Sequence, residues 1–343
     1  MKAVKWFAPH EMRLVEIPQP APAPDEALIR IESTGVCGSD MHYYAEGRIG
    51  GTVITEPLIL GHEYAGTVVD VGKDADASLV GKRVAVEPGI PCLKCEWCLK
   101  GHYNVCLNLK FPGGPPHDGA LCEFIAVHAA FCFPVPDSMT SDVAAMIEPL
   151  AVAIHTVELA RLVPGESVAV LGAGPIGLLT IQVARICGAG TIIATDLHGY
   201  RLEAARRCGA DFAFNAAQTD TVEAVRDSTN GRGVDVVFDC ARSTETPGIG
   251  CHIARPAGRC VLTGISGESE GVFPVDVARR KELMIQWCRR FRFNYPAAID
   301  MVTSKRVDVE SLITHSFPLD RAGEAFELVY RGDDNVLKAS VDQ

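Results

Sequence analysis

The sequence has no apolar run long enough to cross a bilayer, because no window approaches 18 uninterrupted apolar residues. Its first residues, MKAVKWFAPHEM, include charges and a proline but no apolar signal core. These absences argue against a membrane protein and a secreted protein. We therefore expect a cytoplasmic protein with no membrane partner.

Long basic blocks are also missing. The 32 lysines and arginines are outnumbered by 43 aspartates and glutamates, for a formal net charge of −11. The basic residues gather only in short groups at 279–281 and 289–292. An acidic surface of this kind repels a phosphate backbone, so a nucleic-acid partner is not expected.

Cysteine, in contrast, is plentiful, with 13 residues in a chain of 343. A cytoplasmic compartment keeps thiols reduced, and a chain long enough for about two domains does not need disulfide staples. Metal binding is therefore the leading explanation for at least some of these cysteines.

The texture of the sequence changes near residue 153. Before it, short β-like runs separated by Gly and Pro predict an irregular, mostly antiparallel β domain. After it, strands alternate with helical patterns at Pro175–Gly188 and in YRLEAARRCGA, which predicts βαβ units and a parallel sheet. The candidate strands there are SVAVLG, TIIATD, DVVFDCA, GRCVLTG and LMIQWC. A further helix is expected near Arg321–Tyr330.

GAGPIG at 172–177 has the GxGxxG spacing of a dinucleotide fingerprint, and its context strengthens that weak signal. It follows an apolar strand, opens a helix, and is succeeded by a strand ending in Asp196, nineteen residues after Gly177. Gly172 would make the tight turn, Gly174 would let the backbone approach a pyrophosphate, and Gly177 would allow helix and strand to pack closely.

Asp196 would accept hydrogen bonds from the adenosine ribose and repel a 2′-phosphate, which favours NAD over NADP. A strand-end capping role for Asp196 competes with this interpretation. Arg201 could either stack on the adenine or accept a 2′-phosphate. Further cofactor-binding candidates are Pro175, Ile176, Gly264 and Ile265.

Four cysteines lie within CLKCEWCLKGHYNVC, at spacings of three, three and eight residues. Four thiolates can enclose a tetrahedral ion and leave no position open, so Cys92, Cys95, Cys98 and Cys106 predict a structural zinc site. A redox CxxC pair or unrelated surface cysteines are the alternatives, but a redox motif needs only one pair.

A catalytic metal would need other ligands. GVCGSDMHYY at 35–44 and GHEYAG at 61–66 supply Cys37, His62 and Glu63, and three protein ligands plus one open position are the composition of a catalytic zinc site. The segments lie 25 residues apart, and the sequence does not show that they meet. A lone buried cysteine is more often a small core residue.

Taken together, these segments resemble the zinc-dependent medium-chain dehydrogenases, and GVCGSDMHYYAEGRIG followed by GHEYAGTVVDVG is most similar to the sorbitol (polyol) dehydrogenase branch. The resemblance extends over almost the whole chain and includes EPLAVAIH at 148–155. It implies a GroES-like β-rich catalytic domain (1–152 and 290–343, with a zinc lobe at 88–110) into which a Rossmann domain with a doubly wound parallel sheet (153–289) is inserted.

By that resemblance, Cys37, His62 and Glu63 are the catalytic zinc ligands, and Glu148 binds the metal directly or through water. Ser39 and His42 would relay the substrate proton to solvent. Substrate-binding roles fall to Tyr43, Glu148, Arg290 and Phe291. The implied cofactors are NAD and two zinc ions per chain, and the family is often dimeric or tetrameric.

The implied reaction transfers a hydride from a secondary hydroxyl of a polyol to NAD and yields a ketose. Phe291 stands where sorbitol dehydrogenases have a tyrosine, and all four lobe cysteines are present although some animal members lack them. Another alcohol, a sugar phosphate or threonine therefore remains an alternative substrate.

Overall fold

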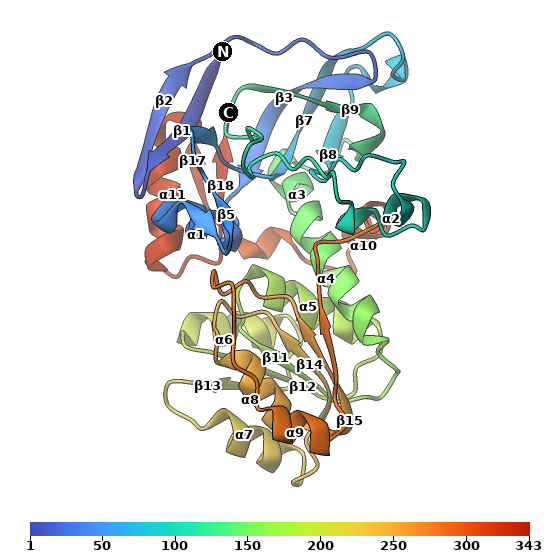
Figure 1. Cartoon of the computed structure of the whole chain (residues 1–343), viewed down its shortest axis with the longest axis vertical. Coiled ribbons are helices and arrows are strands. Elements are labelled where there is room, and N and C mark those ends of the chain that lie inside the picture. The colour runs from blue at the N-terminus through green and yellow to red at the C-terminus, as the bar shows by residue number, and fades with distance from the viewer. The chain divides into compact units, whose positions relative to one another are not determined.

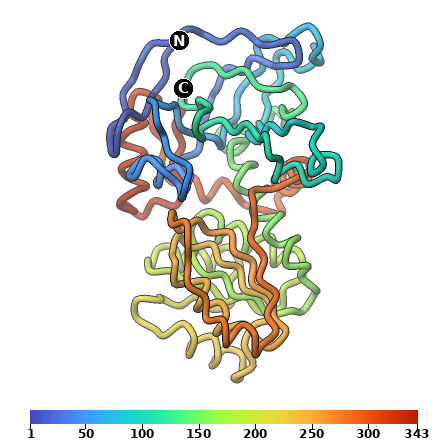
Figure 2. The backbone as a smooth tube through the Cα atoms, in the orientation of Figure 1, coloured from blue at the N-terminus to red at the C-terminus, as the bar shows by residue number.

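The computed structural model describes residues 1–343, and its internal contacts divide the chain into two compact units. The first unit consists of Met1–Glu148, Tyr295–Lys305 and Val309–Gln343, and the second of Pro149–Asn294 and Arg306–Asp308. Both chain termini lie in the first unit (Figure 2). The second unit is thus an insertion into the first.

The first unit is built mainly from strands (Figure 1). They are β1 (Lys2–Ala8), β2 (Glu11–Glu16), β3 (Glu26–Gly35), β4 (Arg48–Ile49), β5 (Thr52–Val53), β6 (Leu58–Ile59), β7 (Glu63–Val71), β8 (Arg83–Val86), β9 (Phe124–His128), β10 (Cys132–Pro134), β17 (Ile313–Pro318) and β18 (Lys338–Asp342). Its helices are α1 (Gly38–Glu46), α2 (Glu96–Leu99), α3 (Ser141–Ala145), α10 (Tyr295–Thr303) and α11 (Ala322–Arg331).

Its largest sheet has the order β10-β8-β7-β3-β18-β17, and β9 also pairs with β3. The pairs β3–β7, β7–β8, β3–β9 and β3–β18 are antiparallel. The pairing of β18 with β3 brings the C-terminal end of the chain beside its N-terminal part. Apolar residues of these strands, among them Ile29, Ile31 and Val68, form the buried core.

The second unit contains a six-stranded parallel sheet of order β13-β12-β11-β14-β15-β16. Its strands are β11 (Val168–Leu171), β12 (Ile192–Asp196), β13 (Phe212–Asn215), β14 (Val234–Asp239), β15 (Ala254–Leu262) and β16 (Met284–Trp287). Its helices are α5 (Pro175–Ile186), α6 (Gly199–Arg207), α7 (Thr221–Ser228), α8 (Thr246–Ile253) and α9 (Val275–Arg280). Numbered from β11, this is the 3-2-1-4-5-6 order of a dinucleotide-binding sheet. The predicted combination of a β-rich domain and a doubly wound parallel sheet is confirmed.

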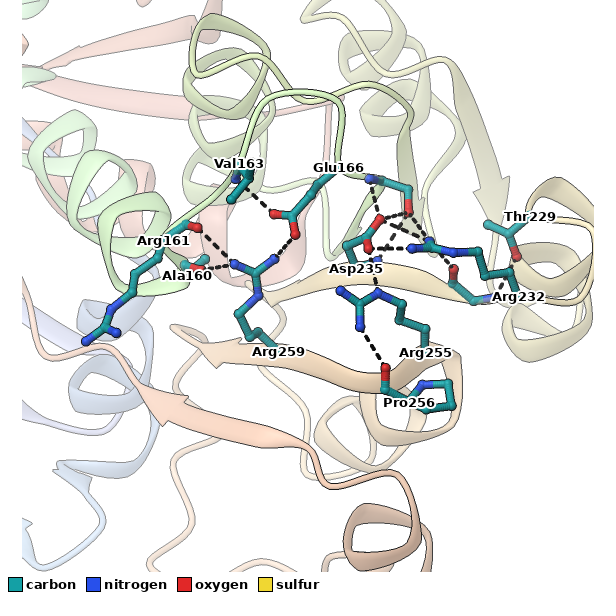
Figure 3. A network of polar contacts seen from close by, with 12 residues as sticks. Ala160, Arg161, Val163, Glu166, Thr229, Arg232, Asp235, Arg255, Pro256 and Arg259 are labelled. Carbon is teal, nitrogen blue, oxygen red and sulfur yellow. Dashed lines mark hydrogen bonds and ion pairs between the residues drawn. The ribbon is translucent and has the colours of Figure 1, made fainter.

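A network of charged side chains holds the amino-terminal ends of the parallel strands together (Figure 3). Asp235, at the start of β14, accepts hydrogen bonds from Arg232 (2.7 Å), Arg255 (2.6 Å) and the backbone N–H of Ser167 (2.9 Å). Burial raises the pKa of the Asp235 carboxyl, but hydrogen bonds from the two arginines and Ser167 outweigh burial and lower it. The network lies at the amino-terminal ends of the strands, whereas ligands of such sheets bind at the carboxyl ends.

The helical stretch Ser141–Ala160, which includes α4 (Ile147–Ala160), is long and apolar enough to cross a membrane, with a mean hydropathy of 1.5. Within the protein, however, 83% of its most apolar window is buried. The apolar composition of the stretch is that of a core helix.

Candidate catalytic and zinc sites

Cys37, His62 and Glu63 come together in the first unit. Their ligand atoms all lie within 4.8 Å of one another, His62 is 5% exposed, and Glu63 is 1% exposed. One thiolate, one imidazole and one carboxylate at this separation fit a zinc ion that keeps a further position open.

Strand pairing closes the 25-residue gap between these ligands. Gly35, the last residue of β3, lies opposite Glu63, the first residue of β7, in the antiparallel register. Cys37 follows the end of β3 by two residues, and His62 directly precedes the start of β7. All three ligands therefore lie at the same end of this strand pair. Gly35 also makes room, because a Cβ atom there would lie 2.4 Å from Glu63 Oε2.

Two charged residues that sequence reasoning missed hold these ligands in place. Asp40, fully buried, lies 3.3 Å from His62 Nδ1 through Oδ1 and accepts a 3.0 Å hydrogen bond from the Cys37 backbone N–H through Oδ2. Lys338, on β18, forms a buried ion pair with Glu63. A carboxylate on the second nitrogen of a metal-binding imidazole fixes its orientation and tautomer.

The electrostatics of the ligands reflect this close packing. Burial raises the pKa of the Cys37 thiol, and the neighbouring Glu63 carboxylate raises it further. Burial would lower the pKa of His62, but the neighbouring Asp40 and Cys37 outweigh burial and raise that pKa well above its usual value. Since a metal binds the thiolate and the neutral imidazole, its binding would displace one proton from the Cys37 thiol and one from the His62 imidazolium.

Glu148 lies outside the group of three ligands that could share one ion. It is 5% exposed and occupies the first turn of α4, where the helix dipole favours a negative charge. Its carboxylate contributes to raising the pKa of Lys338, which places it in the electrostatic surroundings of the site. Its direct or water-mediated binding of metal stays a prediction.

The other predicted residues of this region lie on α1. Ser39 Oγ donates a 3.3 Å hydrogen bond to the Cys37 sulfur, and His42 Nδ1 lies 3.5 Å from Glu46 Oε1. Tyr43 is 9% exposed, and its hydroxyl lies 3.9 Å from the position that a Cβ atom on Gly114 would take. Ser39 therefore contacts a ligand atom, whereas the substrate role of Tyr43 stays a prediction.

The four lobe cysteines also form one cluster, with all ligand atoms within 4.8 Å. The sulfur of Cys95 lies 3.4 Å from that of Cys98 and 3.9 Å from that of Cys106, and the sulfurs of Cys92 and Cys98 are 4.0 Å apart. Sulfurs bound about 2.3 Å from a tetrahedral zinc are about 3.8 Å from one another, so the cluster fits that ion.

Backbone groups prepare this cluster for anionic sulfur. The N–H groups of Cys92 and Asn108 donate to the Cys106 sulfur at 3.3 and 3.4 Å. The N–H of Lys94 contributes most to lowering the pKa of Cys92 to about 6. Burial and the neighbouring thiols raise the pKa of Cys98 to about 12, so a cation is needed to hold all four as thiolates.

The fingerprint glycines of the second unit link β11 to α5. Gly172 has φ +89°, a left-handed conformation, and a Cβ atom on Gly177 would lie 1.9 Å from the Gly172 carbonyl oxygen. Gly174 is the N-cap of α5, and Pro175 occupies the first helical turn, where its missing N–H costs nothing. Ile176 follows Pro175 in the same turn.

Asp196 ends β12, next to this turn. Its Oδ2 accepts a 2.8 Å hydrogen bond from the Ala173 N–H, its Oδ1 accepts one of 3.0 Å from His198 N–H, and Arg201 lies 3.7 Å from Oδ2. Asp196 therefore does make the hydrogen bonds of a strand-end cap. A carboxylate has about four acceptor sites, however, and can also bind a ribose.

The remaining predicted residues lie elsewhere in the second unit. Gly264 and Ile265 follow β15, and a Cβ atom on Gly264 would lie 1.8 Å from the Ala241 carbonyl oxygen. Arg290 has φ +55°, and Phe291 is 2% exposed. The cofactor role of the first pair and the substrate role of the second stay predictions.

Comparison with known proteins agrees with this architecture. Residues 23–137 match the model of the alcohol dehydrogenase GroES-like domain, and residues 175–304 match that of the zinc-binding dehydrogenases. The chain is 38% identical to the sorbitol dehydrogenase of Bacillus subtilis, over 99% of this chain and 97% of that protein. It is 40% identical to human sorbitol dehydrogenase, over 94% and 91% of the two chains.

Among solved structures, a short chain alcohol dehydrogenase from Escherichia coli CFT073 complexed with NADH superimposes with a TM-score of 0.92. It is 30% identical, over 100% of this chain and 99% of that one. Together with the curated relatives, these matches assign this chain to the zinc-dependent medium-chain dehydrogenases, in the branch that resembles sorbitol dehydrogenase.

Proposed function

We propose that this protein oxidises a secondary hydroxyl of a polyol by passing a hydride to NAD, with one catalytic and one structural zinc ion per chain. The observation that carries the proposal is the set of Cys37, His62 and Glu63, whose ligand atoms lie within 4.8 Å of one another and of which His62 and Glu63 are buried. Three such ligands bind zinc and keep one position open for a substrate oxygen.

When bound, zinc would supply a Lewis acid that polarises the hydroxyl oxygen and lowers its pKa. Asp40 would keep the His62 ring oriented through its 3.3 Å contact with Nδ1. Lys338 would offset part of the charge on Glu63, and together these contacts would hold the ligands rigid when no substrate is present.

Ser39 and His42 would carry the hydroxyl proton away from the site. Ser39 Oγ, at 3.3 Å from the Cys37 sulfur, is adjacent to the ligand set, and His42 lies one helical turn further along α1. A positioned proton acceptor contributes typically about 10²-fold or more to such a reaction. Glu148 would orient a neighbouring hydroxyl of the polyol.

For the second substrate, we propose NAD rather than NADP. The turn at Gly172–Gly177 would present free N–H groups of α5 to the pyrophosphate. The Asp196 carboxylate, held by two backbone hydrogen bonds, would accept from the ribose hydroxyls and repel a 2′-phosphate. Sorbitol dehydrogenases among the relatives support a polyol as the hydride donor.

Initial rates decide between these possibilities. Sorbitol, xylitol, galactitol, threonine and a sugar phosphate should each be tested with NAD and with NADP. We expect NAD-dependent oxidation of at least one polyol. Turnover only with a sugar phosphate or threonine, or only with NADP, would replace the corresponding part of the proposal.

A further inference from the structure

A proton that reaches His42 has little direct contact with bulk water at that point. His42 is 7% exposed, so its ring is almost entirely enclosed by protein. The next carboxylate along the helix is Glu46, whose Oε1 lies 3.5 Å from His42 Nδ1 and whose side chain is 42% exposed. This pair therefore joins the buried His42 side chain to a side chain at the protein surface.

Helix geometry aligns the three residues. Ser39, His42 and Glu46 are separated by three and four positions on α1, so they lie one above the other on the same face. Ser39 lies at the inner end, with its hydroxyl on the Cys37 sulfur at 3.3 Å. Glu46 lies at the outer end, one residue before the Gly47 C-cap of the helix.

The contact with Glu46 determines which nitrogen of the His42 ring carries the proton. A carboxylate only accepts hydrogen bonds, so its partner Nδ1 must carry a proton, and the lone pair of the neutral His42 ring is then on Nε2. Arg48 Nη2 lies 3.7 Å from the other oxygen of Glu46, Oε2.

We propose that Glu46 is the outer end of the proton path, a function that rests on the oxidation proposed above. His42 takes a proton on Nε2 and becomes an imidazolium. The Nδ1 proton then passes to the Glu46 carboxylate and from there to water or buffer. One proton enters and one leaves, and the ring returns to its starting tautomer by exchange before the next turnover.

Proton release tests this assignment directly. Protein loaded with zinc and NAD is mixed rapidly with the polyol in weak buffer that contains a pH indicator, in the wild type and in Glu46→Gln. We expect proton release to slow roughly tenfold, because a positioned transfer group contributes about 10²-fold or more and water replaces part of it. Raising the buffer concentration should restore the rate, which a purely structural loss would not allow.

Glu158→Gln is the matched control. His155 Nδ1 and Glu158 Oε2 form a similar helical pair at 3.4 Å, on α4 rather than α1. The rate of proton release in Glu158→Gln should equal that of the wild type. Wild-type release in Glu46→Gln, or slow release that buffer does not restore, overturns the role of Glu46. Absence of NAD-dependent oxidation in the wild type would instead overturn the proposed function.

A second measurement needs no turnover. The ¹⁵N chemical shifts of histidine distinguish the Nδ1–H from the Nε2–H tautomer. We expect neutral His42 to carry its proton on Nδ1 in the wild type and to lose that preference in Glu46→Ala. Unchanged shifts of His42 in Glu46→Ala would show that Glu46 does not set the ring and would refute the proposal.

Discussion

Glu87 gives a stability prediction that depends on one buried carboxyl group. It follows β8, is 2% exposed, and its Oε1 has no hydrogen-bond partner. Burial raises its pKa from 4.5 to about 7, against the lowering effect of a hydrogen bond with Tyr103. The folded protein therefore retains a proton on Glu87 at pH values where the unfolded chain has lost it.

The sign and size of the effect follow from this difference. Below pH 4.5 Glu87 is protonated in both the folded and the unfolded state. As the pH rises from 4.5 toward 7, the unfolded chain loses this proton first, so the free energy of unfolding falls relative to that of a protein with a neutral side chain at this position. A difference of about 2.5 pH units, each equivalent to about 1.4 kcal/mol, gives a full loss of about 3 kcal/mol above pH 7. Glu87→Gln, which keeps the neutral shape, should avoid this loss.

Urea titrations of the zinc-loaded protein at several pH values measure the effect. The advantage of Glu87→Gln over the wild type should grow by about 2 kcal/mol between pH 5.5 and 8.5. Glu56→Gln, at an exposed position of the same unit, is the control and should show no such trend. A constant difference in unfolding free energy between Glu87→Gln and the wild type across this range would show that burial does not raise the pKa of Glu87.

Three further substitutions test other parts of the structure. Cys98→Ser should lower the zinc content by about one ion and reduce the melting temperature, because three thiolates hold the lobe less firmly than four; unchanged zinc content contradicts the lobe assignment. Lys338→Met should destabilise the metal-free protein by about 3 kcal/mol or more, since it leaves Glu63 buried without a cation. A denaturation midpoint of the metal-free variant equal to that of the metal-free wild type would show the ion pair to be unimportant. Asp196→Ala should narrow the preference for NAD over NADP, measured as the ratio of kcat/KM values; an unchanged ratio would leave Asp196 with its capping role alone.

The sequence predicted the elements better than their contacts. The alternation of apolar strands and helices after residue 153 indicated the parallel sheet, and β11 and β14 are fully buried runs of the kind that such sheets need. β13 was missed because Phe212–Asn215 is short, lies at the sheet edge and is exposed or half-buried, so it lacks that apolar signature.

The candidate site shows the same limit. The residue types of Cys37, His62 and Glu63 indicated a metal site, but only the pairing of β3 with β7 brings them together. Lys338 lies 275 positions from Glu63, and no local pattern could join them. One signal was available, since Lys338 is a single charge in the otherwise apolar and small run VLKASV, and such a buried lysine needs a partner.

Zinc content per chain, measured together with turnover in the wild type and in Cys37→Ala, shows whether Cys37 holds a catalytic zinc ion. We expect about two zinc ions and NAD-dependent polyol oxidation in the wild type, against about one zinc ion and no turnover in the variant. A Cys37→Ala protein that keeps both its zinc content and its activity would contradict the catalytic site described here.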